Sequence, residues 1–439
     1  MPKEPYHLTP EQLALSEARK AQKLHAQKKP PQVPVTLIPR IWMESSLTKA
    51  SQNDENDELR VKVMTWNMLA QCLVRRDLFP GSDCLKASQR DPLLHAELLM
   101  HGADIMCLQE VDRVELLLPV LEGAGYRAHH AAAPSKKHGC LIAYKHECFT
   151  KTFEKVIYYD NEQLHADGED NYRRGSSFRT RNIGFAAVLR STSSDSLGVV
   201  VVTTHLFWHP RYTYERARQT YILIREVLKF RSENGLNDWP CIFAGDFNFP
   251  PNDIVYSLLF RDPIESQQKE DFSSSMVVHL SIDPTVPRTL QPSTDGEEGG
   301  DPDRIITSAR PALPKDGLLG VGELEGLFKN LPRLCSVYDE GLGRCLTNHP
   351  EVKTFGQRKE LPSERHGRHE PEYSSYTHYW QSTIDYIYVL NPADVDSEVT
   401  KLLMPHKGAD MAPGLPRSGI CGSDHVALGA ELLWRRNKR

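Results

Sequence analysis

The stretch Cys241–Phe249 reads CIFAGDFNF, and it decides how the fold is interpreted. Its first residues form a short apolar run, which is typical of a strand that is buried on both faces. Asp246 and Asn248 follow two residues apart, so strand alternation points both side chains in one direction. A carboxylate that can accept a proton from water then lies beside a neutral amide that can hold a phosphate oxygen. An Asx turn is the alternative interpretation of this pair.

Two more apolar runs end at a polar side chain in the same way. Ile105–Leu108 leads to Glu110, and Val199–Thr204 leads to His205. Three polar groups, counting Asp246, are therefore expected at strand ends. Glutamate is a poor core residue, which favours a functional interpretation of Glu110, whereas a hydrogen-bonded structural histidine is the alternative for His205.

The first patterned segment of the chain also ends at a polar group. Leu59, Val61, Val63 and Thr65 alternate with polar or larger residues, as in a half-buried strand, and the strand leads to Asn67. A site built from glutamate, aspartate and asparagine oxygens suits Mg²⁺, which keeps several waters and binds phosphate beside one or two carboxylates. The strand ends therefore predict a magnesium site.

Two segments near the end of the chain add acids and an imidazole. Gly422–Val426 places Asp424 and His425 at the start of a strand, and Thr383–Ile387 places Asp385 inside another. A histidine that is oriented by a carboxylate stays basic or cationic beside a phosphate, which suits phosphodiester hydrolysis. A capped turn and a hydrogen-bonded core aspartate are the alternatives for these two segments.

The remaining pattern predicts a mixed α/β architecture. Four apolar residues recur at helical spacing between the strands that end at His205 and Asp246, so we expect an amphipathic helix that packs on a sheet. These residues are Ala217, Tyr221, Ile224 and Leu228, and further strands are expected at Cys140–Tyr144, Phe185–Leu189, Ile384–Leu390 and Val426–Leu433.

Composition excludes several classes of protein. The chain has 439 residues, 39% hydrophobic and 25% charged, which excludes wholesale disorder, and its net charge of −5 excludes a polybasic nucleic-acid wrapper. The nine cysteines contain no C-x-x-C pair, which disfavours a disulfide framework and a cysteine zinc site. We find no signal peptide and no apolar run that could span a bilayer. A soluble protein of the cytoplasm or nucleus, without membrane contact, is expected.

The chain divides into four parts by composition. Residues 1–58 are expected to be a disordered or tail-like extension, with a basic RNA-binding arm or a targeting segment as the alternative. The folded domain is expected at 59–434, and an acidic insertion at about 264–330 interrupts it. The basic residues 435–439 are expected to be a solvated tail, with a nuclear-targeting or RNA contact as the alternative.

Taken in order, these motifs resemble the endonuclease/exonuclease/phosphatase superfamily over roughly 59–434, with the insertion left out. That resemblance implies a two-sheet α/β sandwich, which is deoxyribonuclease-like and four-layered. The motif residues are Asn67, Glu110, His205, Asp246, Asn248, Asp385, Asp424 and His425.

Three shorter sequence motifs resemble those of the deadenylase and nocturnin branch of the superfamily. Tyr376–Ile387 (YTHYWQSTIDYI) looks like the stretch before the late aspartate of that branch, and His205–Pro210 (HLFWHP) looks like its histidine strand. Trp66–Ala70 (WNMLA) is similar to its opening motif. The nearest resemblance is to the fungal Ngl-type RNA exonucleases, which are implicated in RNA 3′-end trimming.

The resemblance implies a role for each metal residue. Glu110 would ligate Mg²⁺, or alternatively Mn²⁺, with Asn67 nearby. Asp424 would complete the metal or water shell. The ion would neutralise the phosphate and assist the leaving 3′-oxygen.

It also implies the catalytic roles. Asp246 would orient or deprotonate the attacking water, and Asn248 would hold the scissile phosphate. His425, oriented by Asp385, would stabilise the pentacovalent transition state. His205 would donate to a phosphate oxygen.

Substrate-binding roles follow from three further positions. Asn182 matches a phosphate-contact position of the family. Pro210 and Trp380 match the two positions that sandwich a nucleobase, with tryptophan in place of the usual phenylalanine. A core position is the alternative for Trp380.

One departure from the family concerns charge. Deadenylases commonly have an acidic residue before the Gly-Cys strand, where this chain has Lys136–Cys140 (KKHGC), so a poly(A) preference is not implied. Arginines upstream of Asn182 add local positive charge that favours polyanion binding, with a solvated loop as the alternative. They are Arg173, Arg174, Arg179 and Arg181.

The sequence therefore predicts a Mg²⁺-dependent 3′→5′ exoribonuclease that acts on RNA 3′ ends and releases 5′-mononucleotides, in rRNA trimming or deadenylation. A nocturnin-like phosphatase acting on a nucleotide or dinucleotide is one alternative. A non-catalytic RNA-binding protein on a nuclease fold is the other, and the intact acids and amides disfavour it. The sequence identifies no protein partner.

Overall fold

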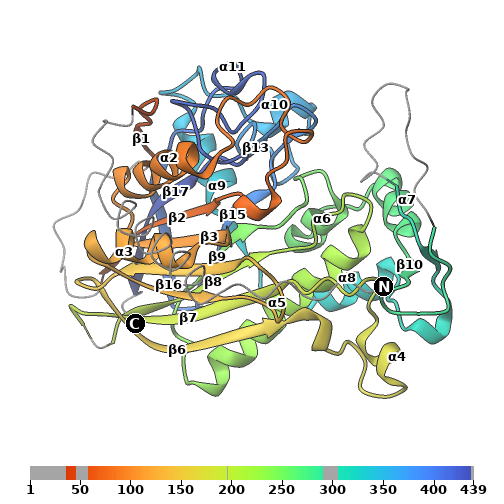
Figure 1. Cartoon of the computed structure of the whole chain (residues 1–439). Coiled ribbons are helices and arrows are strands. Elements are labelled where there is room, and N and C mark those ends of the chain that lie inside the picture. The colour runs from red at the N-terminus through yellow and green to blue at the C-terminus, as the bar shows by residue number, and fades with distance from the viewer. Residues whose placement is uncertain (1–35, 46–57, 195, 290–304, 437–439) are drawn as a thin grey trace, which may run out of the picture. The chain divides into compact units, whose positions relative to one another are not determined.

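The computed structural model describes residues 36–45, 58–194, 196–289 and 305–436 (Figure 1). The elements discussed below belong to one compact unit, Leu37–Arg439. Within the described residues, no helix is both long enough and apolar enough to cross a membrane.

Two mixed sheets form the centre of this unit. In the described residues the first sheet has the strand order β1 (Trp42–Glu44), β16 (Val395–Leu403), β17 (Leu428–Arg436), β2 (Glu58–Asn67), β3 (Ile105–Val111), β5 (Gly139–Lys145) and β4 (Tyr126–Ala131). The second has the order β12 (Cys335–Ser336), β15 (Asp385–Leu390), β9 (Cys241–Asp246), β8 (Gly198–His205), β7 (Ile183–Ser191) and β6 (Phe149–Tyr158). Only the neighbours β2 and β3, and β8 and β9, are parallel within these two sheets.

The unbroken apolar runs follow from burial on both faces of each sheet. Val199 and Val201 of β8 lie in the core between the two sheets, whereas Val200 and Val202 lie in a second core on the outer face. The side chains of β2 alternate between the two faces in the same way, and Val63 is one of those that face the core between the sheets. A strand that is covered on both sides needs apolar residues at every position, which is why periodicity alone does not show the alternation.

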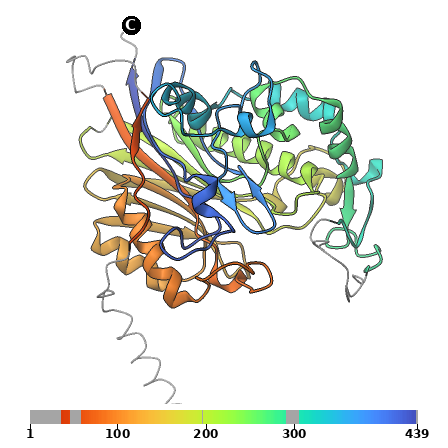
Figure 2. The same ribbon diagram turned by 90° about the horizontal axis from the view of Figure 1, so that it is seen from above.

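Helices cover the two outer faces. On the first sheet, α2 (Ala87–Met100) and α3 (Val114–Gly123) bury leucines against β2, β3 and β5. On the second sheet, α5 (Thr213–Glu233), α6 (Ile254–Phe260) and α8 (Val321–Lys329) bury their apolar faces. In Figure 2 the orange helices α2 and α3 lie on one side of the strands and the green α5 on the other. The four layers confirm the predicted α/β sandwich.

The remaining described helices are short. They are α4 (Asp170–Arg174), α7 (Ser266–Ser274), α9 (Val337–Cys345), α10 (Phe355–Lys359) and α11 (Gly408–Met411).

Part of the predicted N-terminal tail belongs to the domain. Strand β1 pairs antiparallel with β16, and Met43 is fully buried opposite Leu402. The assignment of 1–58 to a tail is therefore wrong for this strand, because its buried methionine adds apolar area to the core. The basic segments of that extension lie outside the described residues.

The two ends of the acidic insertion are folded. Within 264–330 the structure contains α7, the hairpin strands β10 (Val277–His279) and β11 (Ala309–Pro311), and α8. Phe272 and Leu324 are fully buried in the outer core of the second sheet. The acidic residues that suggested an insertion (Asp295, Glu297, Glu298, Asp301 and Asp303) lie outside the described residues.

The predicted basic tail also begins later than expected. Strand β17 continues to Arg436, and the Arg435 guanidinium pairs with Glu58 at 2.8 Å and with Glu398 at 2.9 Å. Residues 437–439 lie outside the described residues.

A buried ion pair in α5 predicts a large effect on stability. Glu215 and Arg218 are fully buried and lie 3.0 Å apart, and Glu215 also accepts a hydrogen bond from the Ser177 backbone N–H at 2.9 Å. Glu215→Ala should lower the free energy of unfolding by about 3 kcal/mol or more, because it leaves a buried cation without its counter-charge. Urea unfolding measures this change.

A surface pair on the same helix serves as the control. Lys229 and Glu233 are 3.9 Å apart and mostly exposed. Lys229→Ala should change the free energy of unfolding by less than about 1 kcal/mol. Equal losses for Lys229→Ala and Glu215→Ala would contradict a stabilising role of the buried pair.

Candidate active site

Strand register brings the predicted catalytic side chains to one end of the second sheet. Asp246 at the end of β9 pairs with His205 of the parallel strand β8 and with Asp385 of the antiparallel strand β15. One aspartate therefore lies between an imidazole and a second carboxylate. The sequence predicts His205 and Asp246 at strand ends and Asp385 inside a strand, and the register makes the three residues neighbours.

Asn67 connects this cluster to the first sheet. Its side chain is buried, and its Nδ2 donates to Asp246 Oδ2 at 2.9 Å and to Glu110 Oε1 at 3.1 Å. Its Oδ1 accepts from the Leu69 backbone N–H at 3.0 Å. Asn67 thus orients the carboxylates of both sheets through its amide hydrogens.

Glu110 occupies an irregular position of β3. The register with β5 shifts between Leu108 and Val111, and Glu110 has φ +56°, which is rare for a residue with a side chain. Its Oε2 accepts from the Ala70 backbone N–H at 2.9 Å. A bulge that turns one side chain away from the regular alternation is typical of strand ends beside functional sites.

Asn248 has the same backbone strain. Its φ is +54°, its backbone N–H donates to Asp246 Oδ1 at 3.0 Å, and its Nδ2 donates to the Leu206 carbonyl at 3.0 Å. The hydrogen bond to Asp246 is the Asx-type turn that was the alternative interpretation. The turn and the predicted phosphate contact are compatible, because the turn uses only the backbone N–H, and one of the two Nδ2 hydrogens is not used by the Leu206 carbonyl.

Asp385 and His425 form a buried pair. His425 Nδ1 lies 2.8 Å from Asp385 Oδ2, which also accepts from the Ser374 hydroxyl at 2.7 Å. Burial opposes the charged imidazole, but Asp385, Asp246 and Asp424 together hold the pKa of His425 well above its usual value. His425 Nε2 lies 3.8 Å from Asp246 Oδ2. The pair therefore presents a cationic donor to the centre of the site.

His205 has the opposite protonation. Its Nδ1 lies 3.8 Å from Glu110 Oε1 and its Nε2 lies 3.6 Å from Asp246 Oδ2. Burial lowers the pKa of His205 to about 3, although Glu110 raises it. His205 is therefore a neutral imidazole near pH 7, which can donate one hydrogen bond without adding charge.

The two acids between these histidines differ in proton affinity. Burial raises the pKa of Asp246, and the neighbouring Asp385 raises it further. Burial also acts to raise the pKa of Glu110, but His205, His138 and the hydrogen bond from the Ala70 backbone outweigh it, and that pKa is lowered. Asp246 is thus suited to accept a proton, whereas Glu110 is suited to remain a carboxylate.

The remaining predicted residues lie around this centre. Asp424 is half-buried, burial raises its pKa, and its carboxylate accepts a long hydrogen bond of 3.4 Å from Ser423. Asn182 Nδ2 donates to the His205 carbonyl at 2.7 Å. Arg173 and Arg174 both pair with the carboxylate of Asp170, so they are not available as free cations.

Among the described residues, two arrangements have the chemistry of a cation site. One ligand atom each from Asp246, Asp385 and His425 lie within 4.8 Å of one another. The other is the carboxylate of Glu110, which is partly exposed and has its charge favoured by its neighbours. Its oxygens match the donors that Mg²⁺ prefers, so the residues present fit a hard divalent cation.

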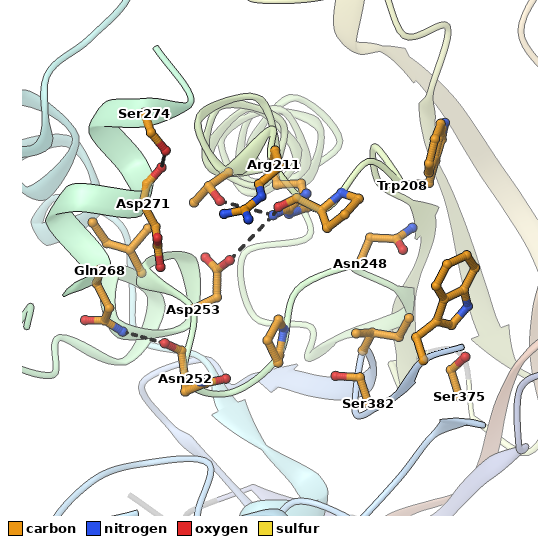
Figure 3. Close-up of a pocket in the computed structure, with 17 residues that line it drawn as sticks. Trp208, Arg211, Asn248, Asn252, Asp253, Gln268, Asp271, Ser274, Ser375 and Ser382 are labelled. Atoms are coloured by element: carbon orange, nitrogen blue, oxygen red, sulfur yellow. Dashed lines mark hydrogen bonds and ion pairs between the residues drawn. The ribbon is translucent and has the colours of Figure 1, made fainter. Parts of the chain in front are cut away.

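A cavity of about 470 Å³ opens beside Asn248. Pro210 and Trp380 both line it, and Trp380 is 37% exposed, so the core interpretation of this tryptophan is wrong. Figure 3 shows Trp208 and Asn248 toward one end and Gln268 and Asp271 of α7 at the other. The folded end of the predicted insertion therefore forms one wall of the cavity.

Sequence reasoning missed two residues of the site. Ser374 orients Asp385 but lies in a loop eleven positions earlier, and no motif marked it. Trp208 lines the cavity and is 49% exposed. A signal for Trp208 was present, because a large aromatic residue two positions before Pro210 in a polar segment is unusual for a surface.

Comparisons with known proteins place these observations in a family. The model of the Endonuclease/Exonuclease/phosphatase family matches residues 64–425. A probable RNA exonuclease of Schizosaccharomyces pombe is 29% identical over 98% of this chain and 88% of the relative. RNA exonuclease NGL2 of Saccharomyces cerevisiae is 27% identical over 85% of this chain and 78% of the relative.

Solved structures share the fold. ANGEL2, described as a 2′,3′-cyclic phosphatase, superposes with a TM-score of 0.57 at 20% identity over 90% of this chain and 99% of that structure. The human Nocturnin catalytic domain gives 0.50 at 18% identity over 90% and 97%. The family match extends over most of the chain and includes the residues from Asn67 to His425, so this chain belongs to the endonuclease/exonuclease/phosphatase family.

Proposed function

We propose that the protein is a Mg²⁺-dependent 3′→5′ exoribonuclease that releases 5′-mononucleotides from RNA. The observation that carries the proposal is the position of the aromatic-lined cavity directly beside the Asp246–Asn248 turn. A nucleobase in the cavity would place its 5′-phosphate against the catalytic side chains. The relatives named as RNA exonucleases support the choice of RNA.

The proton chemistry follows from the geometry. Asp246 would hold the attacking water and accept its proton, which its raised pKa favours. His425, kept protonated by Asp385 at 2.8 Å, would donate to the phosphoryl oxygens as negative charge develops on them. His205 and Asn248, which both lie next to Asp246, would add neutral donors. Water attacks phosphorus, and the bond from phosphorus to the 3′-oxygen breaks.

Glu110 would hold the cation, with Asn67 orienting its carboxylate and Asp424 completing the metal or water shell. When bound, Mg²⁺, or Mn²⁺ as the alternative, supplies Lewis-acid stabilisation of the phosphate and of the leaving 3′-oxygen. Asp246, Asp385 and His425 are assigned to proton transfer instead, because the proton on His425 opposes a cation there.

Attack from the 3′ end fits the shape of the cavity. Its far wall is made by α7, with Gln268, Asp271 and Ser274 among its lining residues (Figure 3). Because α7 lines the far side of the cavity, we expect the cavity to accept one terminal nucleotide better than a chain that continues through it. The enzyme would therefore remove nucleotides one at a time.

Labelled oligo(A) tests this proposal. With a 5′ label and Mg²⁺, the expected products are successively shorter labelled strands, and with a 3′ label the first product is a labelled mononucleotide. Omission of Mg²⁺ should abolish both. A phosphorylated nucleotide is assayed in parallel, and its hydrolysis without RNA cleavage would replace the proposal with the phosphatase alternative.

The stacking role of Trp380 predicts a loss of catalytic efficiency on RNA. Trp380→Ala should lower kcat/KM by about 5- to 150-fold, corresponding to about 1–3 kcal/mol for one stacked base. Because an indole face stacks on every base, oligo(A) and oligo(U) should lose similar amounts. Steady-state rates on both polymers measure the effect.

Tyr379→Ala is the matched control, because Tyr379 is adjacent and exposed but does not line the cavity. Its rates should stay close to those of the wild type. An unchanged RNA rate for Trp380→Ala would contradict the stacking role, and a much larger loss on oligo(A) than on oligo(U) would indicate base-specific recognition.

A further inference from the structure

The loop between β4 and β5 lies on the side of the site that is formed by Glu110 and His205. Gly139 opens β5 and pairs with Val111, the residue after Glu110. The ring of His138, one residue earlier, has its centroid 6.4 Å from that of His205. The loop is held closely, because a Cβ at position 139 would lie 2.2 Å from the Ala131 carbonyl. The loop carries Lys136 and Lys137, and Lys136 is the less exposed of the two.

A second segment brings Arg181 to the same side. The carboxylate of Asp160 accepts hydrogen bonds from the backbone N–H groups of Thr180 at 3.1 Å and Arg181 at 2.9 Å. The next residue, Asn182, donates to the His205 carbonyl at 2.7 Å. Arg181 has φ +55°, a strained conformation that these contacts hold in place.

The charges of the two segments interact with each other and with Glu110. Burial lowers the pKa of Lys136, Glu110 raises it, and Arg181 lowers it again. Among the described residues, neither the Lys136 ammonium nor the Arg181 guanidinium has a carboxylate within 4.0 Å. The like charges of Lys136 and Arg181 oppose each other, so an anionic ligand between them would be stabilised.

The direction in which the RNA chain leaves the site indicates that these cations lie beside it. The cavity beside Asn248 takes the terminal nucleotide, and none of its lining residues belongs to the two cationic segments. The remaining RNA must leave on another side. The leaving 3′-oxygen belongs to the preceding nucleotide and is assigned to the Glu110 side, where Lys136 and Arg181 lie.

We propose that Lys136 and Arg181 form a cationic rim that binds RNA phosphates on the 5′ side of the scissile bond. The inference rests on the proposed exoribonuclease function and deepens it. A dinucleotide has no phosphate that could reach the rim, whereas longer RNA has several. The rim thus makes the enzyme prefer longer strands.

The test compares a dinucleotide with an oligonucleotide of about ten residues. For the wild type, kcat/KM should be higher on the longer RNA, mainly through a lower KM. In the double variant Lys136→Gln, Arg181→Gln, the ratio of kcat/KM on long RNA to that on the dinucleotide should fall at least about tenfold. The slope of log KM against log salt should fall by about 0.7 for each RNA phosphate that the variant no longer binds.

Matched controls separate local charge from total charge. The double variant Arg173→Gln, Arg174→Gln removes the same two charges from the neighbouring segment, where both arginines pair with Asp170. It should leave the length ratio and the salt slope as in the wild type. Lys136→Arg, which keeps the charge, should keep the length ratio. Circular dichroism melting shows whether each variant is folded.

The outcomes are distinguishable. A wild type that cleaves no RNA overturns the exoribonuclease proposal and the rim with it. A wild type that cleaves RNA, with a Lys136 and Arg181 variant that keeps the length ratio, overturns the rim alone. Equal losses on dinucleotide and long RNA also overturn it, because the cations would then act on the scissile phosphate.

Discussion

Glu110→Ala is expected to lower RNA hydrolysis in Mg²⁺ at least about 10³-fold while leaving the fold intact. The substitution removes the carboxylate that the structure keeps ionised, and with it the Lewis-acid stabilisation of the phosphate, which is worth several kcal/mol. Single-turnover rates over a range of Mg²⁺ concentrations measure the loss. Alanine adds no new backbone strain at φ +56°, because glutamate already has a Cβ there.

Cation binding can be measured independently of enzymatic activity. Mg²⁺ should raise the melting temperature of the wild type by mass action and should not raise that of Glu110→Ala. Glu122→Ala, which removes an exposed acid from the end of α3, is the control and should behave as the wild type. Activity near the wild-type level for Glu110→Ala would rule out the assignment of the cation to Glu110.

Asp246→Asn should be inactive and should still bind RNA. The change removes the proton acceptor with little change of shape, and general-base catalysis contributes about 10²–10⁴-fold. Asparagine can still accept the hydrogen bond from Asn67 Nδ2 at the position of Oδ2 but not also the one from the Asn248 backbone. Fluorescence anisotropy with labelled RNA measures binding.

The control for Asp246→Asn is the same substitution at a surface aspartate. Asp238 is exposed and lies before β9, in the loop that leads into the strand ending at Asp246. Asp238→Asn should retain activity. If Asp246→Asn loses RNA binding together with activity, Asp246 is a structural residue and not the proton acceptor.

The buried strands could be predicted because their sequences contain no pattern that would indicate another structure. Val199–Val202 and Cys241–Ala244 are apolar throughout. The predicted runs Val199–Thr204 and Cys241–Gly245 lie inside β8 and β9, respectively, as expected. Strands β6 and β16 were missed because they carry charges: Lys151, Glu154 and Lys155 lie in β6, which is an edge strand. Edge strands commonly carry charged side chains that limit further pairing, so their sequence looks like that of a loop.

The site residues that could be predicted from the sequence are those whose reactive side chains lie at the end of a strand. His205, Asp246 and Asp385 become neighbours because register brings them together, and the motif order indicated the same set. Ser374 was not predictable, because its contact with Asp385 depends on the path of a loop. The position of α7 at the cavity could not be predicted because its segment is polar in composition, with Phe272 as the apolar residue that anchors the helix in the core.

The most direct test of the account is the fate of the water oxygen. RNA is digested to completion in water labelled with heavy oxygen, and the released mononucleotides are analysed by mass spectrometry. If Asp246 directs water onto phosphorus and the bond to the 3′-oxygen breaks, each product is a 5′-mononucleotide with one heavy oxygen in its phosphate. Products that carry a 3′-phosphate or a 2′,3′-cyclic phosphate would contradict the account.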